Sequence, residues 1–126
     1  MEDSKKERLS QALDALTATG GVEGAAIVTH DGLLVLSKLV SDVDGETFAA
    51  MSAAMTGAAE TAVAELGKGD VERVIVESRK VKLVSAGAGK ETIVVVLARP
   101  DANLGLVLIE LKKATQKVSA ELSKGS

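Results

Sequence analysis

Residues 87–90, Gly-Ala-Gly-Lys, contain part of the pattern of a phosphate-binding loop, in which backbone amides and a lysine hold a nucleotide. Such a loop needs glycine, four further residues and then Gly-Lys-Ser/Thr, and it opens a helix. Here Val84 stands in place of the first glycine, and Glu91 in place of the serine or threonine. Because the stretch also joins two predicted strands, we interpret it as a hairpin turn.

Acid–base or metal chemistry has few candidate residues in this chain. His30 is the only histidine, and Asp31 beside it is a turn residue. Glu60 and Glu65 are five residues apart, a spacing that does not bring two side chains together on a helix. Asp44 precedes a predicted helix, where capping explains it. We therefore expect no catalytic residue, cofactor or metal site, and a protein that is not an enzyme.

The charge of the chain also restricts its partners. Arg73, Arg79 and Arg99 could donate hydrogen bonds to another protein's phosphate, but solvated strand or turn residues explain them better. The net charge is −3 and the pI about 5.2, which argues against DNA. Phe48 is the only aromatic residue, so the stacking platforms of single-strand binders are missing. We expect a binding module with no nucleic-acid partner.

The length and composition predict that these residues belong to a single domain. The 126 residues include 46% apolar residues and no cysteine, which fits a globular core without disulfides or zinc–cysteine sites. The charged start is not followed by the apolar segment of a signal peptide, and no apolar run has the length of a membrane span. We expect a domain over residues 1–126, with a core of about 3–122, in a cytoplasmic protein without direct membrane insertion.

A helix predicted over Gly45–Leu66 organises the rest of the chain. It is rich in strong helix formers and would be about 33 Å long. Asp44 stands at the N-cap position, and Gly67 follows the last turn, where a left-handed residue is common. Apolar residues recur at helical spacing and predict the face that lies on the sheet: Phe48, Met51, Met55, Ala59, Ala62 and Leu66.

The opposite face of this predicted helix has no basic residue and consists mainly of small side chains. It comprises Glu46, Ala50, Ala53, Gly57, Glu60, Thr61 and Ala64. Small residues let another backbone approach closely, so we expect a second subunit or a partner to cover this face. An alanine-rich surface helix without a partner is the alternative.

Hairpin signals predict five strands, over residues 22–29, 33–36, 71–77, 81–86 and 92–98. With helices over about 3–18, 45–66 and 104–122, the order is α-β-β-α-β-β-β-α. Hairpins indicate an antiparallel sheet, and three helices on one sheet usually cover both faces. The expected fold class is therefore α/β (more strictly α+β), a three-layer, profilin-like sandwich. The most apolar strand, 92–98, should be central, and 71–77 is a candidate edge that can pair with another chain.

Three stretches in this order carry a family likeness: VEGAAIVTHDGLLV at 22–35, ETFAAMSAAM at 46–55 and ANLGLVLIELKKA at 102–114. The strand block VERVIVES lies between the second and the third. Together they make the chain similar to the Roadblock/dynein light chain family, in particular to its stand-alone prokaryotic members.

The resemblance implies a homodimer in which the third strands join two sheets and the second helices lie side by side. Its dimer-interface candidates are Val71, Arg73, Val74, Ile75, Val76, Ala54 and Ala58. It also implies a platform for a Ras-like small GTPase, because family members serve as regulators or scaffolds of such GTPases. The corresponding partner-binding candidates are Glu46, Ala50, Ala53, Gly57, Glu60 and Thr61.

The sequence therefore supports two alternative functions. The first is a dimeric, non-enzymatic regulator or effector platform whose affinity differs between nucleotide states of its GTPase. The alternative is a structural scaffold or light-chain-type assembly subunit that ignores the nucleotide.

Overall fold

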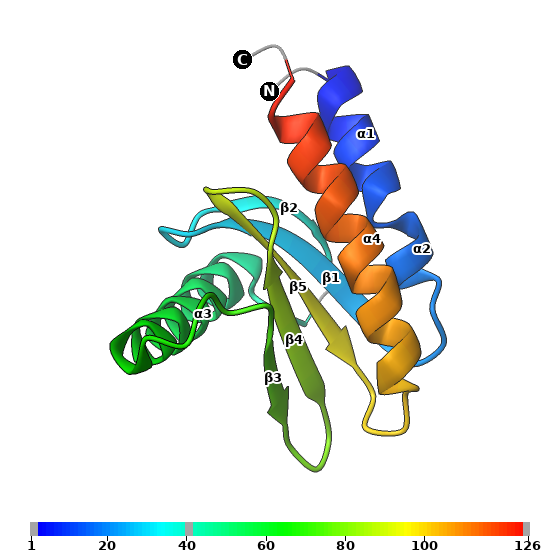
Figure 1. Cartoon of the computed structure of the whole chain (residues 1–126). Coiled ribbons are helices and arrows are strands. Elements are labelled where there is room, and N and C mark those ends of the chain that lie inside the picture. The colour runs from blue at the N-terminus through cyan, green and yellow to red at the C-terminus, as the bar shows by residue number, and fades with distance from the viewer. Residues whose placement is uncertain (1–2, 40–41, 125–126) are drawn as a thin grey trace.

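Five strands form one antiparallel sheet in the computed structural model, which describes residues 3–39 and 42–124 (Figure 1). Residues 1–2, 40–41 and 125–126 of the predicted domain lie outside the described residues. The strands are β1 (Val22–Thr29), β2 (Leu34–Lys38), β3 (Val74–Glu77), β4 (Lys82–Gly87) and β5 (Thr92–Ala98). Their order across the sheet is β2-β1-β5-β4-β3, and every neighbouring pair is antiparallel.

The helices are α1 (Asp3–Ala12), α2 (Asp14–Thr17), α3 (Gly45–Leu66) and α4 (Leu104–Leu122). Helices α1, α2 and α4 cover one face of the sheet and α3 the other, which confirms the predicted three-layer α+β sandwich (Figure 1). The single first helix predicted over 3–18 is wrong. It breaks at Leu13, whose N–H bonds to the Ser10 carbonyl three residues back, a tighter turn than an α-helix allows. Leu13 at the break and Leu16 after it are both fully buried.

The centre of the sheet is formed by β1 and β5, as their apolar sequences predict. Successive side chains of β5 alternate between the two cores. Val94 and Val96 pack with α1 and α4, whereas Ile93 and Val95 pack on the α3 side. Both faces of the strand are thus covered, which explains why five consecutive residues, 92–96, are buried.

The rotation of α3 differs from the prediction. The buried residues of this helix are Ala49, Ser52, Ala53 and Thr56. Met51 and Leu66, predicted to lie on the sheet, are 61% and 70% exposed. Ala53, predicted on the outer face as a partner contact, is 6% exposed beneath the helix. The cause is a buried hydrogen bond of 2.8 Å between the hydroxyls of Thr56 and Ser85, which holds the small, polar side of the helix against β4.

Strand β3 is shorter than predicted and begins at Val74 instead of Val71. Its ladder with β4 runs only from Val74, opposite Ser85, to Glu77, opposite Lys82. Val71 and Arg73 therefore precede the strand. The position of β3 at the edge of the sheet is confirmed.

Candidate protein-interaction surface

Only the first half of α3 is anchored to the sheet. Its buried residues lie within 49–56, whereas residues 61, 62 and 64–66 are exposed, and the second half extends beyond the sheet (Figure 1). Short helices without tertiary packing are marginal in water. The overhanging half is therefore a helical surface with little tertiary packing of its own.

One side of α3 presents an apolar surface, which we call the apolar flank. It consists of Met51, Met55, Ala58, Ala62 and Leu66, of which only Met55 is half-buried and the others are exposed. Next to it on the helix lie Ala59 and Val63, which border an open hollow of about 510 Å³ between α3 and the β3 edge. The apolar flank is thus continuous with the edge of the sheet.

The other wall of this hollow contains four of the predicted dimer residues: Val71, Arg73, Val74 and Ile75. Val76 follows in β3 and is 38% exposed. Within the described residues β3 pairs only with β4, so its outer edge keeps unpaired backbone groups. Ala54 and Ala58 are also exposed; Ala58 belongs to the apolar flank, but neither residue borders the hollow. The structure therefore brings most, but not all, of these candidates together.

The second side of α3, the hairpin-side flank, consists of Glu46, Ala50, Gly57, Glu60 and Thr61. These are the remaining predicted partner contacts, and all are exposed or half-buried. The β1–β2 turn rests on this flank, because a Cβ atom at Gly32 would lie 3.3 Å from the Ala50 Cα. Gly32 also has a φ of 95°, so the close approach and the turn both require glycine.

Sequence reasoning missed a close approach between the His30 imidazole and the Glu60 carboxylate. The His30 Nε2 lies 3.6 Å from a Glu60 carboxylate oxygen and so links the β1–β2 turn to α3. Both side chains border a hollow of about 520 Å³ that also contains Lys90 and Asp70. The two residues are 30 positions apart, and only the packing of the turn onto α3 brings them together. Within the described part of the chain, no three His, Cys, Asp or Glu side chains are grouped to hold a metal ion.

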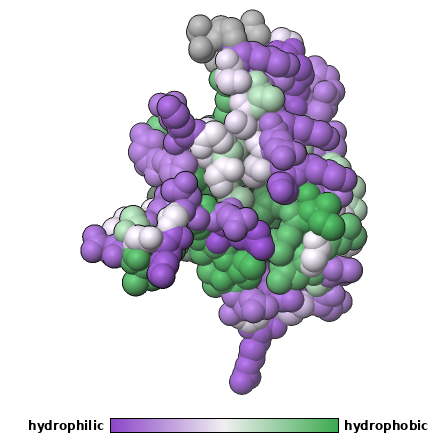
Figure 2. All heavy atoms as spheres, in the orientation of Figure 1, coloured by the Kyte–Doolittle hydropathy of each residue, from purple (hydrophilic) through white to green (hydrophobic). Residues whose placement is uncertain are grey.

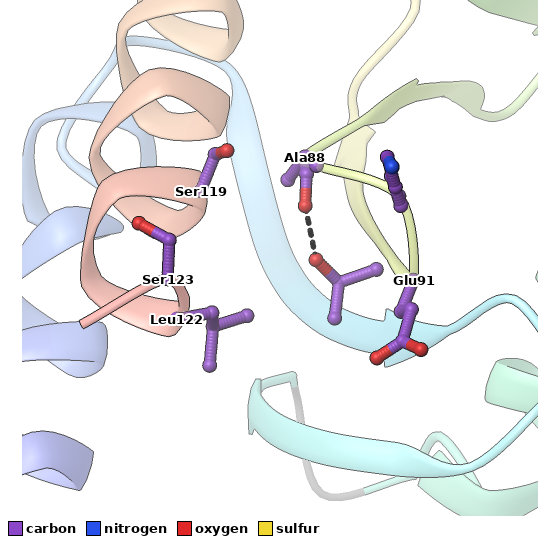
Figure 3. Close-up of a pocket in the computed structure, with 8 residues that line it drawn as sticks. Ala88, Glu91, Ser119, Leu122 and Ser123 are labelled. Carbon is purple, nitrogen blue, oxygen red and sulfur yellow. Dashed lines mark hydrogen bonds between the residues drawn. The ribbon is translucent and has the colours of Figure 1, made fainter. Parts of the chain in front are cut away.

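The Gly-Ala-Gly-Lys stretch forms the turn between β4 and β5, as predicted. Ala88 N–H donates to the Thr92 carbonyl at 2.8 Å, the Thr92 hydroxyl donates back to the Ala88 carbonyl, and Gly89 has a φ of 82°. A recess of about 380 Å³ separates this turn from Ser119, Leu122 and Ser123 at the end of α4 (Figure 3). The turn opens no helix, so the backbone geometry of a phosphate loop does not form here.

Two carboxylates form hydrogen bonds that stabilise helices, one at the N-terminus of α3 and one between α1 and α4. The Asp44 carboxylate accepts hydrogen bonds from the Thr47 hydroxyl at 3.0 Å and from the Glu46 and Thr47 backbone at 3.1 and 3.4 Å. These bonds, chiefly that of the Thr47 side chain, lower the pKa of Asp44. The hydrogen bonds of Asp44 confirm the predicted N-cap of α3.

Glu121 on α4 accepts a hydrogen bond from Arg8 on α1, and this bond lowers the pKa of Glu121.

The fold is that of a profilin-like α+β protein, with one side of a helix exposed and one edge of the sheet open. The sequence of residues 9–98 matches the Roadblock/LC7 domain, and the chain belongs to this family. Two uncharacterized proteins of Methanocaldococcus jannaschii are each 39% identical over 112 residues, which cover 89% of this chain and 97% of theirs.

Solved structures agree on the fold. The gliding protein MglB of Thermus thermophilus superimposes with a TM-score of 0.88 at 18% identity, over 99% of this chain and 96% of its own. Profilin IA of Acanthamoeba castellanii superimposes with a TM-score of 0.61 at 15% identity, over 90% of this chain and 97% of its own. Within residues 3–39 and 42–124, no helix combines the length and hydropathy needed to cross a bilayer.

Proposed function

We propose that this protein is a dimeric, non-enzymatic regulator or binding platform for a Ras-like small GTPase. The observation that carries the proposal is the continuity between the apolar flank of α3 and the unpaired edge of β3. This is the surface through which the family resemblance implies a dimer. Membership of the Roadblock/LC7 family supports the GTPase as partner, and the cytoplasm is the compartment that we expect.

The dimer follows from pairing two copies of β3 across a twofold axis. Such an interface is isologous, because the same patch is used by both subunits. It would satisfy the free backbone groups of the edge and place the two α3 helices side by side. Met51 and Leu66, the exposed large side chains of the apolar flank, would then be buried. A stable interface of this kind buries at least about 1,000 Å² in total.

The GTPase would bind the hairpin-side flank, which β3 pairing leaves uncovered. This flank carries Glu46 and Glu60 beside the small residues Ala50 and Gly57, so a partner backbone can approach it closely. Regulation requires the flank to bind one arrangement of the GTPase switch regions more tightly than the other. The protein's own residues act in this mechanism by binding and orienting the GTPase, without a catalytic group.

The experiment compares nucleotide states directly. Each Ras-like GTPase encoded in the same genome is purified, loaded with GDP or with a non-hydrolysable GTP analogue, and titrated against the full chain by calorimetry. We expect one GTPase to bind, with at least about tenfold different affinity for its two states. Equal affinity for both states contradicts regulation and supports the scaffold. Binding of none of these GTPases contradicts the GTPase partner altogether.

A structural scaffold or light-chain-type subunit is the second candidate function. The hollow between α3 and β3 favours it, because this surface can assemble chains without any nucleotide. This role predicts a stable complex with another protein, and the affinity of that complex should not change with the bound nucleotide.

A further inference from the structure

A second apolar surface lies on the opposite face of the sheet from α3, between α4 and the β3–β4 hairpin. Ile75 points to this face, because it is paired with Val84, which is buried beneath the α1–α4 layer. Ile75 is 40% exposed. Figure 2 shows hydrophobic residues over the first half of α4 and over the neighbouring part of the sheet, with hydrophilic residues between them.

A groove of about 270 Å³ runs between these two elements. Its floor includes Ala86 of β4 and Leu108 of α4, and the Thr115 hydroxyl beside it is already bonded to the Lys112 carbonyl at 2.8 Å. The volume is below the roughly 300–1,000 Å³ of small-molecule sites. The groove therefore fits one or two aliphatic side chains of another protein better than a free ligand.

The rim of the groove is basic where the apolar floor ends. Arg73 and Lys112 both border it and are exposed, and within the described residues neither has a carboxylate at ion-pair distance. Glu72 is the only acidic residue on the rim. By contrast, α3 on the other face has three glutamates and no basic residue. The two faces of the sheet thus differ in the charge of the partner that they favour.

We propose that this groove binds an amphipathic helix with acidic residues, contributed by a protein other than the GTPase. An aliphatic side chain of that helix enters the groove over Leu108, and a neighbouring aliphatic residue contacts Ile75. Its carboxylates pair with Arg73 and Lys112 at the rim. Binding of a helix by its apolar residues in a groove is a recurrent mode of recognition. The site goes beyond the proposed function, because it lies on the opposite face from α3 and leaves the hairpin-side flank free. Arg73, which also borders the hollow of the proposed dimer surface, is shared by the two sites, whereas Lys112 belongs to this groove alone.

The test uses two synthetic helical peptides with the same leucine positions at i, i+3, i+4 and i+7. One carries glutamate at the remaining positions and the other lysine. Each is titrated into the full, isotope-labelled chain by NMR, and the amide shifts identify the residues in contact. Lys112→Glu and Arg73→Glu reverse the rim charge. Lys117→Glu, an exposed α4 position that does not border the groove, is the matched control.

We expect the glutamate peptide to bind and to shift the amides of Ala86, Leu108 and Lys112. Lys112→Glu should weaken binding at least about tenfold, and Lys117→Glu by less than about twofold. Equal binding of the two peptides, or an unchanged affinity of Lys112→Glu, overturns the proposal. Vesicles of phosphatidylcholine and phosphatidylserine form a third arm. If the chain binds these vesicles through Lys112 but not the glutamate peptide, the surface belongs to a membrane and the proposal is wrong.

Discussion

The Thr56 and Ser85 hydroxyls form a hydrogen bond of 2.8 Å that is buried between α3 and β4. Thr56 is 3% exposed and Ser85 is fully buried, so neither hydroxyl has water as an alternative partner. The bond fixes the rotation of α3 about its axis. With Thr56 against the sheet, Met51 is directed to solvent, and the apolar flank becomes available to a second chain.

The contributions of the Thr56 and Ser85 hydroxyls to stability are expected to be coupled. Thr56→Val alone or Ser85→Ala alone leaves one buried hydroxyl without a partner, which should lower the free energy of unfolding by about 1–3 kcal/mol. The double variant removes both hydroxyls and should lose less than the sum of the single changes. Urea denaturation of the four proteins gives the coupling free energy. Strictly additive losses would mean that the two hydroxyls do not stabilise the fold as a pair.

The apolar flank should control the oligomeric state. Met51→Glu places a charge that would be unpaired in a dimer interface, while in the monomer this position is 61% exposed. We expect light scattering to fall from twice the chain mass of 12.9 kDa to that of one chain, without loss of helical circular dichroism. Leu106→Glu, at an exposed leucine of α4, is the control and should leave the mass unchanged. A wild-type protein that is already monomeric contradicts the dimer.

The hairpin-side flank should control partner binding separately. A Cβ atom at Gly57 meets no heavy atom within 4 Å, so Gly57→Lys should fold normally. The lysine would hold a partner's backbone away from α3, and we expect GTPase affinity to fall at least about tenfold. Calorimetry measures the affinity, and light scattering checks that the oligomer persists. Ala120→Lys, at an exposed position of α4, is the matched control. Unchanged affinity of the Gly57 variant would place the GTPase elsewhere.

Acid should weaken the N-terminus of α3. The hydrogen bond from the Thr47 side chain, with the backbone bonds, holds the pKa of Asp44 below its ordinary value of 3.8. The unfolded chain therefore takes up this proton first, and the stabilisation present above the ordinary pKa is lost as the pH falls through the lower, folded-state pKa.

The comparison of wild type with Asp44→Ala measures this loss. The difference in unfolding free energy should be constant above about pH 5 and should shrink as the pH approaches about 3. A difference that is independent of pH over this range would show that the charge of Asp44 does not contribute to the cap.

Much of the architecture could be predicted from local pattern. Alternating and continuous apolar runs identify the strands, because side chains on a strand point alternately to two faces. The almost wholly apolar β5 therefore had to be central. Asp44 and Gly67 mark the ends of α3 correctly, since capping depends on residues within one turn of the helix.

The candidate surfaces could be predicted only in part. An alanine-rich helix has several faces of similar hydrophobicity, so periodicity does not say which one is buried. For this reason the periodicity wrongly predicts that Met51 and Leu66 face the sheet and that Ala53 faces outward. The third strand was extended to Val71, because a sequence pattern does not show where the ladder with β4 ends.

By itself, the sequence determined the order of the strands and main helices, the caps of α3, the central strand and the family, because all of these depend on neighbouring residues or on their order along the chain. The tertiary structure decided which side of α3 faces the sheet and which residues meet at its surfaces. The packing brings Thr56 to Ser85, 29 residues away, and His30 to Glu60, 30 residues away. It also places Arg73 and Leu108, 35 residues apart, on the same groove. Such contacts depend on the packing of whole elements, which no local pattern of residue types contains.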